Sequence, residues 1–309
     1  MPTKMVKRGL AALSTAAVAA LWSAPAAAAW TLNLREGVTE LSREIYGLHM
    51  LILWICVAIA VAVFGVMIYS IATFRKSKGA VAADFDHNTK AEIIWTVIPV
   101  VILVAMAIPA AKTLVKIDDT RGADMTVKVT GYQWKWQYDY VDEGVAFFST
   151  LSQASNEARQ LDSGIDVHQV ENYLLDVDNP MVVPVGKKVR VLVTAADVIH
   201  NWWVPDFGMK KDAIPGYVNE LWFRADTVGT YRGQCAELCG RDHGFMPVVV
   251  KVVEQAEYDS WLASQKAARQ AAAAPAAQTA SVPTAVVPAV ATTTTEANET
   301  TTVLVANAE

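Results

Sequence analysis

The sequence contains little cysteine and little charge, and each shortage excludes a class of protein. Its 309 residues include only three cysteines, too few for a disulfide framework, and no Cys-x-x-Cys-His run, which argues against an attached c-type haem. Charged residues make up 18% of the chain and hydrophobic residues 53%, a balance typical of a protein that lies partly in a membrane. The net charge of −5 argues against nucleic acid as a partner, because phosphates need a basic face.

Residues 1–29 have the features of a secretory signal peptide. Three basic residues precede an uncharged stretch of Ala, Leu and Val, which ends in small residues before Trp30. A short first membrane anchor is the alternative. Cleavage after Ala29 would leave 280 residues with a net charge of −8. We therefore expect a bacterial protein whose mature N-terminus faces the periplasm.

Two long apolar stretches predict a transmembrane hairpin, at residues 45–74 and 93–112. Each holds about the 20 apolar residues that span a bilayer. Residues 75–92 between them carry four basic side chains, so the positive-inside rule predicts a cytoplasmic loop. Residues 30–44 then form a periplasmic N-terminal segment. The expected location is the bacterial inner (plasma) membrane, in contact with lipid, as a multi-pass protein.

Short β-branched segments separated by Gly, Pro, Asp and Asn follow the second apolar stretch. They predict a small antiparallel barrel or sandwich over residues 123–262. A closing helix is expected at 258–269. The composition then changes to Ala, Thr, Pro and Val, which cannot form a core, so residues 271–309 are expected to be a disordered tail.

A cluster of sulfur and imidazole side chains predicts a metal site. Cys235 and Cys239 are four residues apart, His243 and Met246 follow closely, and His200 lies upstream. Soft sulfur ligands combined with imidazole and a thioether favour copper. Two thiolates at this spacing can bridge a pair of copper ions, which leaves one histidine for each metal. Ligands supplied wholly by the protein leave no open position for a substrate, so the pattern indicates electron transfer.

Less specific interpretations remain open for the same residues. Cys235 and Cys239 could form a disulfide in an oxidising compartment, or the two cysteines and two histidines could hold a structural zinc ion. His243 alone would be an ordinary surface histidine, and Met246 alone would be a core residue. The third cysteine, Cys56, lies within the first apolar stretch and is expected to be a small apolar filler.

These residues closely resemble subunit II of the haem–copper cytochrome c oxidases, over nearly the whole mature chain. The matching context includes Asp197-Val198-Ile199-His200 and Asp212-Ala213-Ile214-Pro215-Gly216. The resemblance implies a cupredoxin-like barrel that bears a dinuclear copper centre, CuA. The implied copper ligands are His200, Cys235, Cys239, His243, Met246 and the backbone carbonyl of Glu237. The resemblance also implies that the Glu237 carboxylate binds magnesium or manganese at the border with the catalytic subunit.

An aromatic segment from Gly131 to Tyr140 supports the resemblance. If the segment is a strand, Gln133, Lys135 and Gln137 share one face, and Trp134, Trp136 and Tyr138 share the other. Trp136 and Tyr138 are expected in the core. The resemblance implies that Trp134 is the residue through which electrons from cytochrome c reach the copper pair.

The start of the second apolar stretch, Glu92 to Pro99, is similar to the second helix of the same family. There the glutamate marks the cytoplasmic mouth of a proton path into the catalytic subunit. An ordinary carboxylate at a helix end is the alternative for Glu92. One departure is Tyr217, which follows Pro215-Gly216 where the family often has arginine.

Acidic residues are concentrated in one segment. Residues 139–178 contain nine acidic side chains and one basic side chain, a net charge equal to that of the whole mature chain. Such a patch would attract a basic protein such as cytochrome c over a long range. The leading candidates for docking are Asp139, Asp142 and Asp197.

The sequence therefore predicts an electron-transfer subunit of a proton-pumping terminal oxidase. Cytochrome c would donate electrons, the copper pair would accept them, and haem in the catalytic subunit I would receive them, with subunit III as a further partner. Oxygen reduction would occur in the partner subunit. The main alternative is a membrane-tethered copper-binding or copper-delivery protein. A quinol oxidase subunit lacks the copper ligands, and nitrous oxide reductase needs a further large domain.

Overall fold

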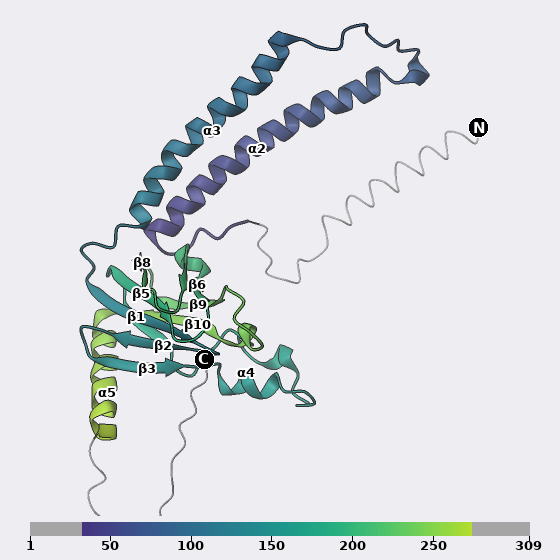
Figure 1. The fold of residues 1–309 in the computed structure, drawn as a ribbon. Coiled ribbons are helices and arrows are strands. Elements are labelled where there is room, and N and C mark those ends of the chain that lie inside the picture. Colours follow the sequence, from purple (N-terminus) through teal and green to yellow (C-terminus); the bar gives the residue numbers. More distant parts are fainter. Residues whose placement is uncertain (1–32, 274–309) are drawn as a thin grey trace, which may run out of the picture.

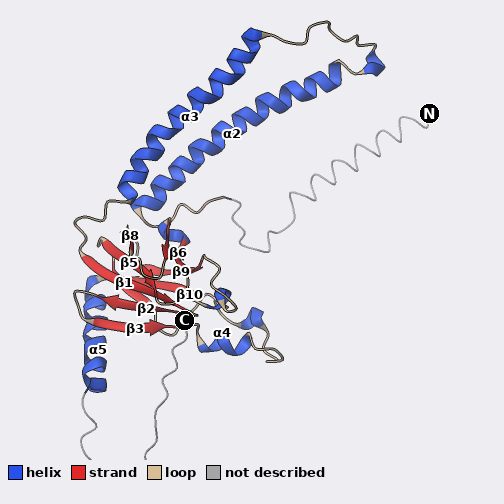
Figure 2. Cartoon of the chain, in the orientation of Figure 1, coloured by secondary structure: helices blue, strands red, loops and turns tan. Residues whose placement is uncertain are grey.

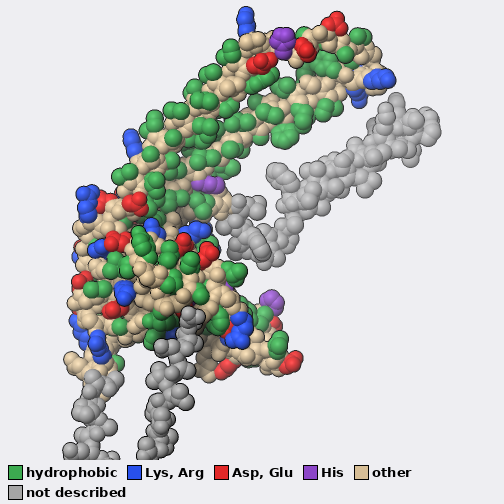
Figure 3. All heavy atoms as spheres, in the orientation of Figure 1, with side chains coloured by type: hydrophobic (Ala, Val, Ile, Leu, Met, Phe, Trp, Pro, Cys, Tyr) green, Lys and Arg blue, Asp and Glu red, His purple; other side chains and the backbone are tan. Residues whose placement is uncertain are grey.

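The computed structural model describes residues 33–273 as a two-helix hairpin joined to a β-domain (Figure 1). The predicted signal peptide lies outside the described residues, as do residues 274–309 of the predicted tail. Helix α2 (Glu40–Thr73) and helix α3 (Thr89–Ile117) form the hairpin. The short 3₁₀ helix η1 (Lys76–Lys78) lies in the loop between them. Apolar side chains cover both helices, whereas charged side chains gather at the hairpin tip and on the β-domain (Figure 3).

Both membrane helices are longer than the apolar stretches that predicted them. Helix α2 begins at Glu40 because Thr39 caps it: the Thr39 hydroxyl accepts from the Ser42 N–H, and Ser42 Oγ accepts from the Thr39 N–H. Asn88 caps α3 in the same manner. The capping residues lie outside the uncharged stretches. The positions of the flanking charged residues therefore underestimate the length of each helix. Within the described residues, two helices are long and apolar enough to cross a membrane. The expected multi-pass protein is therefore more accurately described as one with two membrane spans.

The β-domain consists of two five-stranded sheets (Figure 2). One sheet has the order β3-β2-β1-β5-β8 and the other β4-β10-β9-β6-β7. The strands are β1 (Met125–Tyr132), β2 (Lys135–Tyr140), β3 (Val145–Ser149), β4 (Met181–Pro184), β5 (Val189–Ala195), β6 (His200–Val204), β7 (Met209–Ala213), β8 (Asn219–Phe223), β9 (Gly229–Cys235) and β10 (Pro247–Val253). The smaller helices are α4 (Gln153–Ala158), η2 (Val167–Gln169), η3 (Pro205–Phe207) and η4 (His243–Phe245).

The expected all-β domain is confirmed, but it is not wholly antiparallel. Each sheet contains one parallel pair, β1 with β5 and β4 with β10. Both pairs join strands that are far apart in the sequence, a relation that local alternation cannot predict. Strand β2 alternates as expected and buries Trp136 and Tyr138 in the core between the sheets. Trp202 is also fully buried.

A C-terminal helix, α5 (Gln255–Ala273), packs against the β-domain. Tyr258 and Leu262 are buried in the core, and Lys266 Nζ lies 2.5 Å from Glu143 Oε2. The helix extends the predicted 258–269 in both directions. The prediction of disorder was therefore wrong for residues 271–273. The first turns of the helix are held against the β-domain, and alanine, which has a high helix propensity, continues the helix from there.

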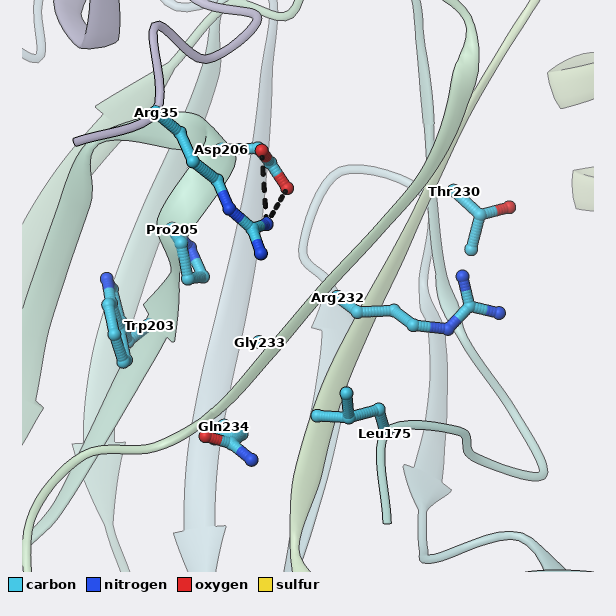
Figure 4. A pocket seen from close by; sticks show the side chains of 9 residues that line it. All are labelled: Arg35, Leu175, Trp203, Pro205, Asp206, Thr230, Arg232, Gly233 and Gln234. Carbon is cyan, nitrogen blue, oxygen red and sulfur yellow. Dashed lines mark hydrogen bonds and ion pairs between the residues drawn. The ribbon is translucent and has the colours of Figure 1, made fainter. Parts of the chain in front are cut away.

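The N-terminal segment fastens the hairpin to the β-domain. Arg35 Nη1 lies 3.3 Å from Asp206 Oδ2, and the Thr39 hydroxyl donates to the Phe207 carbonyl at 3.0 Å. Arg35 also lines an open pocket with residues of β6 and β9, among them Trp203 and Arg232 (Figure 4). None of the candidate metal ligands lines this pocket, which is separate from the metal centre.

Candidate metal centre

Two strands and one loop bring the candidate ligands together. His200 opens β6 and Cys235 closes β9, and the two strands are hydrogen-bonded neighbours with Trp202 opposite Cys235. The loop from β9 to β10 carries the other three ligands, Cys239, His243 and Met246. The sheet register therefore supplies one imidazole and one thiol, and the loop supplies the rest.

The donor atoms converge around the two sulfurs. Cys235 Sγ and Cys239 Sγ are 3.8 Å apart, which is too far for a disulfide, whose S–S bond is about 2.05 Å. His200 Nδ1 lies 4.0 Å from Cys235 Sγ, and His243 Nδ1 lies 3.5 Å from Cys239 Sγ. Each thiol thus has its own imidazole. Met246 Sδ lies 3.6 Å from Cys239 Sγ.

One backbone carbonyl joins the side-chain donors. The carbonyl of Glu237 lies 3.4 Å from Cys235 Sγ. Both cysteines and Met246 are buried, and His200 is completely inaccessible. Two thiolates, two imidazoles, a thioether and a carbonyl form a soft donor set that suits copper rather than a hard cation. The residues present therefore fit a copper centre.

Asp197 fixes the orientation of His200. Its carboxylate accepts from His200 Nε2 at 2.9 Å and from the Gln133 N–H at 2.7 Å, which leaves His200 Nδ1 facing the sulfurs. Burial raises the pKa of Asp197, but these hydrogen bonds outweigh burial and hold it below its usual value. Burial lowers the pKa of His200, yet contacts with Cys235 and Asp197 raise it overall.

The two thiols differ in how readily they ionise. Burial raises the pKa of Cys235, but hydrogen bonds from His200 and nearby backbone groups bring it below its usual value. Burial and the adjacent charge of Cys235 raise the pKa of Cys239 to about 12. A bound cation would offset that repulsion, because metal ligation favours thiolates.

Trp134 lies directly behind the metal site. Strand β1 ends at Tyr132 and β2 begins at Lys135, so Gln133 and Trp134 occupy the turn. Trp134 Nε1 donates to the Cys239 carbonyl at 3.1 Å, and Gln133 Nε2 donates to the same oxygen at 2.9 Å. The expectation that these two side chains lie on opposite faces of a strand was wrong, because the turn interrupts the alternation.

The other predicted residues lie further from the donors. Asp139 is five positions along β2 from Trp134, about 17 Å at the usual strand rise, and Asp142 is in the turn beyond. The Glu237 side chain is exposed, as is Tyr217. Glu92 lies in the first turn of α3, where Oε1 accepts from the Asn88 N–H at 3.1 Å.

Several supporting residues were not predicted from the sequence. Gly131 contacts the His200 ring so closely that a Cβ would lie 2.7 Å from His200 Cδ2. Arg159 and Asp242 form an ion pair beside the metal loop. Asp242 adjoins His243 in the sequence, and this adjacency was the only available signal. The other two residues are distant from the ligands in the sequence.

A two-helix membrane anchor, a β-sandwich and a sulfur–imidazole metal site define a membrane-anchored electron carrier. The sequence matches the family models for the transmembrane domain of cytochrome c oxidase subunit II over residues 27–113 and for its periplasmic domain over residues 125–253. Together these matches cover more than two thirds of the chain. The chain therefore belongs to the cytochrome c oxidase subunit II family.

Two relatives agree with this assignment. Cytochrome c oxidase subunit 2 of Cereibacter sphaeroides is 41% identical over 238 residues, which are 74% of this chain and 78% of that protein. The corresponding protein of Arabidopsis thaliana is 36% identical over 241 residues, 78% of this chain and 91% of that protein. The crystal structure of the periplasmic domain of subunit II from Bradyrhizobium japonicum shares 46% identity and covers 48% of this chain and 98% of that one, with a TM-score of 0.42.

Family membership gives the general function. The chain is the electron-transfer subunit of a haem–copper oxidase and functions as part of that oxidoreductase complex with subunit I. The family implies a copper centre, and the described residues contain a His–Cys–Cys group whose donor atoms all lie within 4.8 Å of one another.

Proposed function

We propose that this chain accepts electrons from cytochrome c at Trp134 and passes them through a copper pair to haem in subunit I. The copper ligands would be His200, Cys235, Cys239, His243, Met246 and the Glu237 carbonyl. The observation that supports this most strongly is the pair of sulfurs 3.8 Å apart, each with its own imidazole. A copper pair held by these residues would supply a one-electron carrier. Four of the donor residues, His200, Cys235, Cys239 and Met246, are buried, and such a packed setting would limit their movement when the charge changes.

Metal analysis of the purified oxidase complex tests this proposal. We expect two coppers for each copy of this chain in addition to the copper of the catalytic subunit, and a purple mixed-valence absorption. One zinc ion, or no metal, would contradict the proposal. Haem that co-purifies with the chain would separate it from a free copper-delivery protein.

The same analysis should find one magnesium or manganese, which we propose to bind the exposed Glu237 carboxylate at the border with subunit I.

Trp134 is proposed as the electron-accepting residue because its indole N–H reaches the carbonyl of a copper ligand, Cys239. We expect Trp134→Phe to slow electron transfer from cytochrome c by roughly tenfold, the effect usual for groups directly behind metal ligands. Stopped-flow reduction by cytochrome c measures this rate. The copper absorption should be unchanged, because phenylalanine removes no ligand. Wild-type kinetics would refute the assignment.

The acidic side chains are proposed to steer cytochrome c, with a different part for Asp197 than for the other two. Asp197 is engaged with His200 and with backbone N–H groups, so it serves the metal site as well as the surface charge. Asp139 and Asp142 lie too far from Trp134 for short-range contact and would act through the long-range field. Their contribution should appear in the salt dependence of the same stopped-flow rate.

Glu92 is proposed as the cytoplasmic mouth of a proton path, on the orientation that the positive-inside rule gives to an inner-membrane hairpin. Its carboxylate is partly exposed in the first turn of α3. We expect Glu92→Gln to lower steady-state turnover by roughly tenfold, below the full range for a general acid because water has access. The variant keeps the oxygen that accepts from Asn88, so the helix cap should persist.

The Glu92 measurement has an internal control. The rate of copper reduction by cytochrome c should be normal, since the change is on the opposite side of the membrane. Asp86→Asn, which changes an exposed carboxyl in the loop before α3, should leave turnover unchanged. Equal losses in the two variants would assign the effect to surface charge instead.

Subunit III is a further proposed partner, and subunit analysis of the purified complex tests its presence.

A further inference from the structure

Arg159 is the only basic residue in the acidic segment 139–178, and it does not face the solvent. It directly follows α4, and its side chain is only 22% exposed. It forms no ion pair with any of the nine acidic residues of this segment and pairs with Asp242 of the metal loop instead. A cation placed in this manner calls for an explanation beyond surface charge.

The guanidinium contacts two residues of the metal loop. Arg159 Nη1 lies 3.4 Å from Asp242 Oδ1, and Arg159 Cζ lies 4.2 Å from the centre of the Phe245 ring. The Asp242 side chain is 17% exposed, so this pair is shielded from water more than an ordinary surface pair. Arg159 Nε donates to Asn156 Oδ1 at 2.8 Å, which fixes the plane of the guanidinium.

The two contacted residues are those that precede the loop's last two copper ligands. Asp242 precedes His243, and Phe245 precedes Met246. The backbone between them forms one tight turn, in which the Phe245 N–H donates to the Asp242 carbonyl at 2.9 Å. One side chain therefore holds both ends of the turn that presents an imidazole and a thioether.

Helix α4, which directly precedes Arg159, is itself held in place by hydrogen bonds. Ser155 in α4 is fully buried, and its Oγ accepts from the Leu174 N–H at 3.1 Å. The Ser152 N–H donates to the Asp176 carbonyl at 3.0 Å. These bonds tie α4 to the rest of the segment, so Arg159 links one anchored element to the metal loop.

We propose that Arg159 is a positioning residue for the copper centre, which holds His243 and Met246 in place through Asp242 and Phe245. The proposal rests on the copper ligands assigned above. A planar guanidinium can pair with a carboxylate and stack on an aromatic ring at once, which lysine cannot do. The loop geometry, and with it the spectrum and reduction potential of the bound copper, therefore depends on this one side chain.

The test compares oxidase complexes that carry wild-type chain, Arg159→Gln or Arg159→Lys. We expect Arg159→Gln to change the hyperfine pattern of the mixed-valence copper signal, to shift its reduction potential and to speed copper loss to a copper(I) chelator by roughly tenfold. Arg159→Lys keeps the ion pair and loses the stacking, so it should restore these properties only in part. A purely structural role would lower the melting temperature without moving the potential.

Arg241→Gln is the matched control. Arg241 Nε also lies 3.5 Å from Asp242 Oδ1, but its side chain is 83% exposed, so the copper signal and potential should remain as in wild type. Equal effects of Arg159→Gln and Arg241→Gln would overturn the proposal, as would wild-type spectra and potentials in both Arg159 variants. If the wild-type complex held no copper pair, the ligand assignment itself would fail. If only the role of Arg159 were wrong, the wild-type complex would still contain the copper pair.

Discussion

Replacing Cys239 with serine is expected to abolish the copper pair and to lower cytochrome c oxidation by the complex by about 100-fold or more. Cys239 Sγ is the most central donor, since it lies within 3.8 Å of Cys235 Sγ, His243 Nδ1 and Met246 Sδ. A serine hydroxyl is a hard ligand with a very high pKa, so it does not replace a bridging thiolate on a soft metal. Copper analysis, visible absorption and steady-state turnover measure the loss.

The third cysteine supplies the control for that experiment. Cys56 lies exposed on α2, remote from the donor cluster in the sequence and in the fold. Cys56→Ser should therefore keep two coppers and normal turnover. If Cys239→Ser retained the mixed-valence absorption, the bridging role of this sulfur would be refuted. Haem content, measured in parallel, shows whether the complex still assembles.

The proposed ligand set could be assembled from the sequence because most of it is local. Four of the five side-chain donors lie within twelve residues, so the Cys–Cys–His–Met spacing alone indicates a soft metal. His200 was included by its residue type, and the resemblance then implied the same ligand. The structure explains its place, because β6 and β9 are neighbours in one sheet and bring His200 to Cys235.

The supporting contacts could not be predicted in this way. Trp134 was assigned to a strand face, whereas a turn places it against the Cys239 carbonyl. Arg159 reaches Asp242 across 83 residues of sequence. Such contacts depend on tertiary packing, which neither alternation nor spacing encodes.

For the fold as well, some features could be predicted from the sequence and others could not. Helix existence followed from the apolar stretches, and the strand segments from β-branched alternation. Helix ends did not follow, because the caps at Thr39 and Asn88 lie outside those stretches. The parallel pairing of β1 with β5 did not follow either, since register between distant strands is set by the burial of both.

Gly131→Ala is expected to displace His200 and thereby remove one ligand of the copper pair. The added Cβ would lie 2.7 Å from His200 Cδ2 and 3.0 Å from Cγ. Strand β1 cannot move away easily, because it is paired with β2 on one side and with β5 on the other. The imidazole cannot move easily either, since Trp136 packs against it at 5.8 Å between ring centres. Such overpacking costs about 1–3 kcal/mol of folding free energy.

A shift of either group would misplace the His200 imidazole relative to the two sulfurs, so the metal-binding function should suffer more than folding does. We expect Gly131→Ala to lower copper affinity by about 10–100-fold, with an altered mixed-valence signal and a modest drop in melting temperature. Gly244→Ala is the matched control, because Gly244 adjoins the ligand His243 but has no atom within 4 Å of an added Cβ. It should bind copper normally. Equal copper loss in both variants would mean that backbone stiffness in the site, rather than the room left for His200, decides whether copper binds.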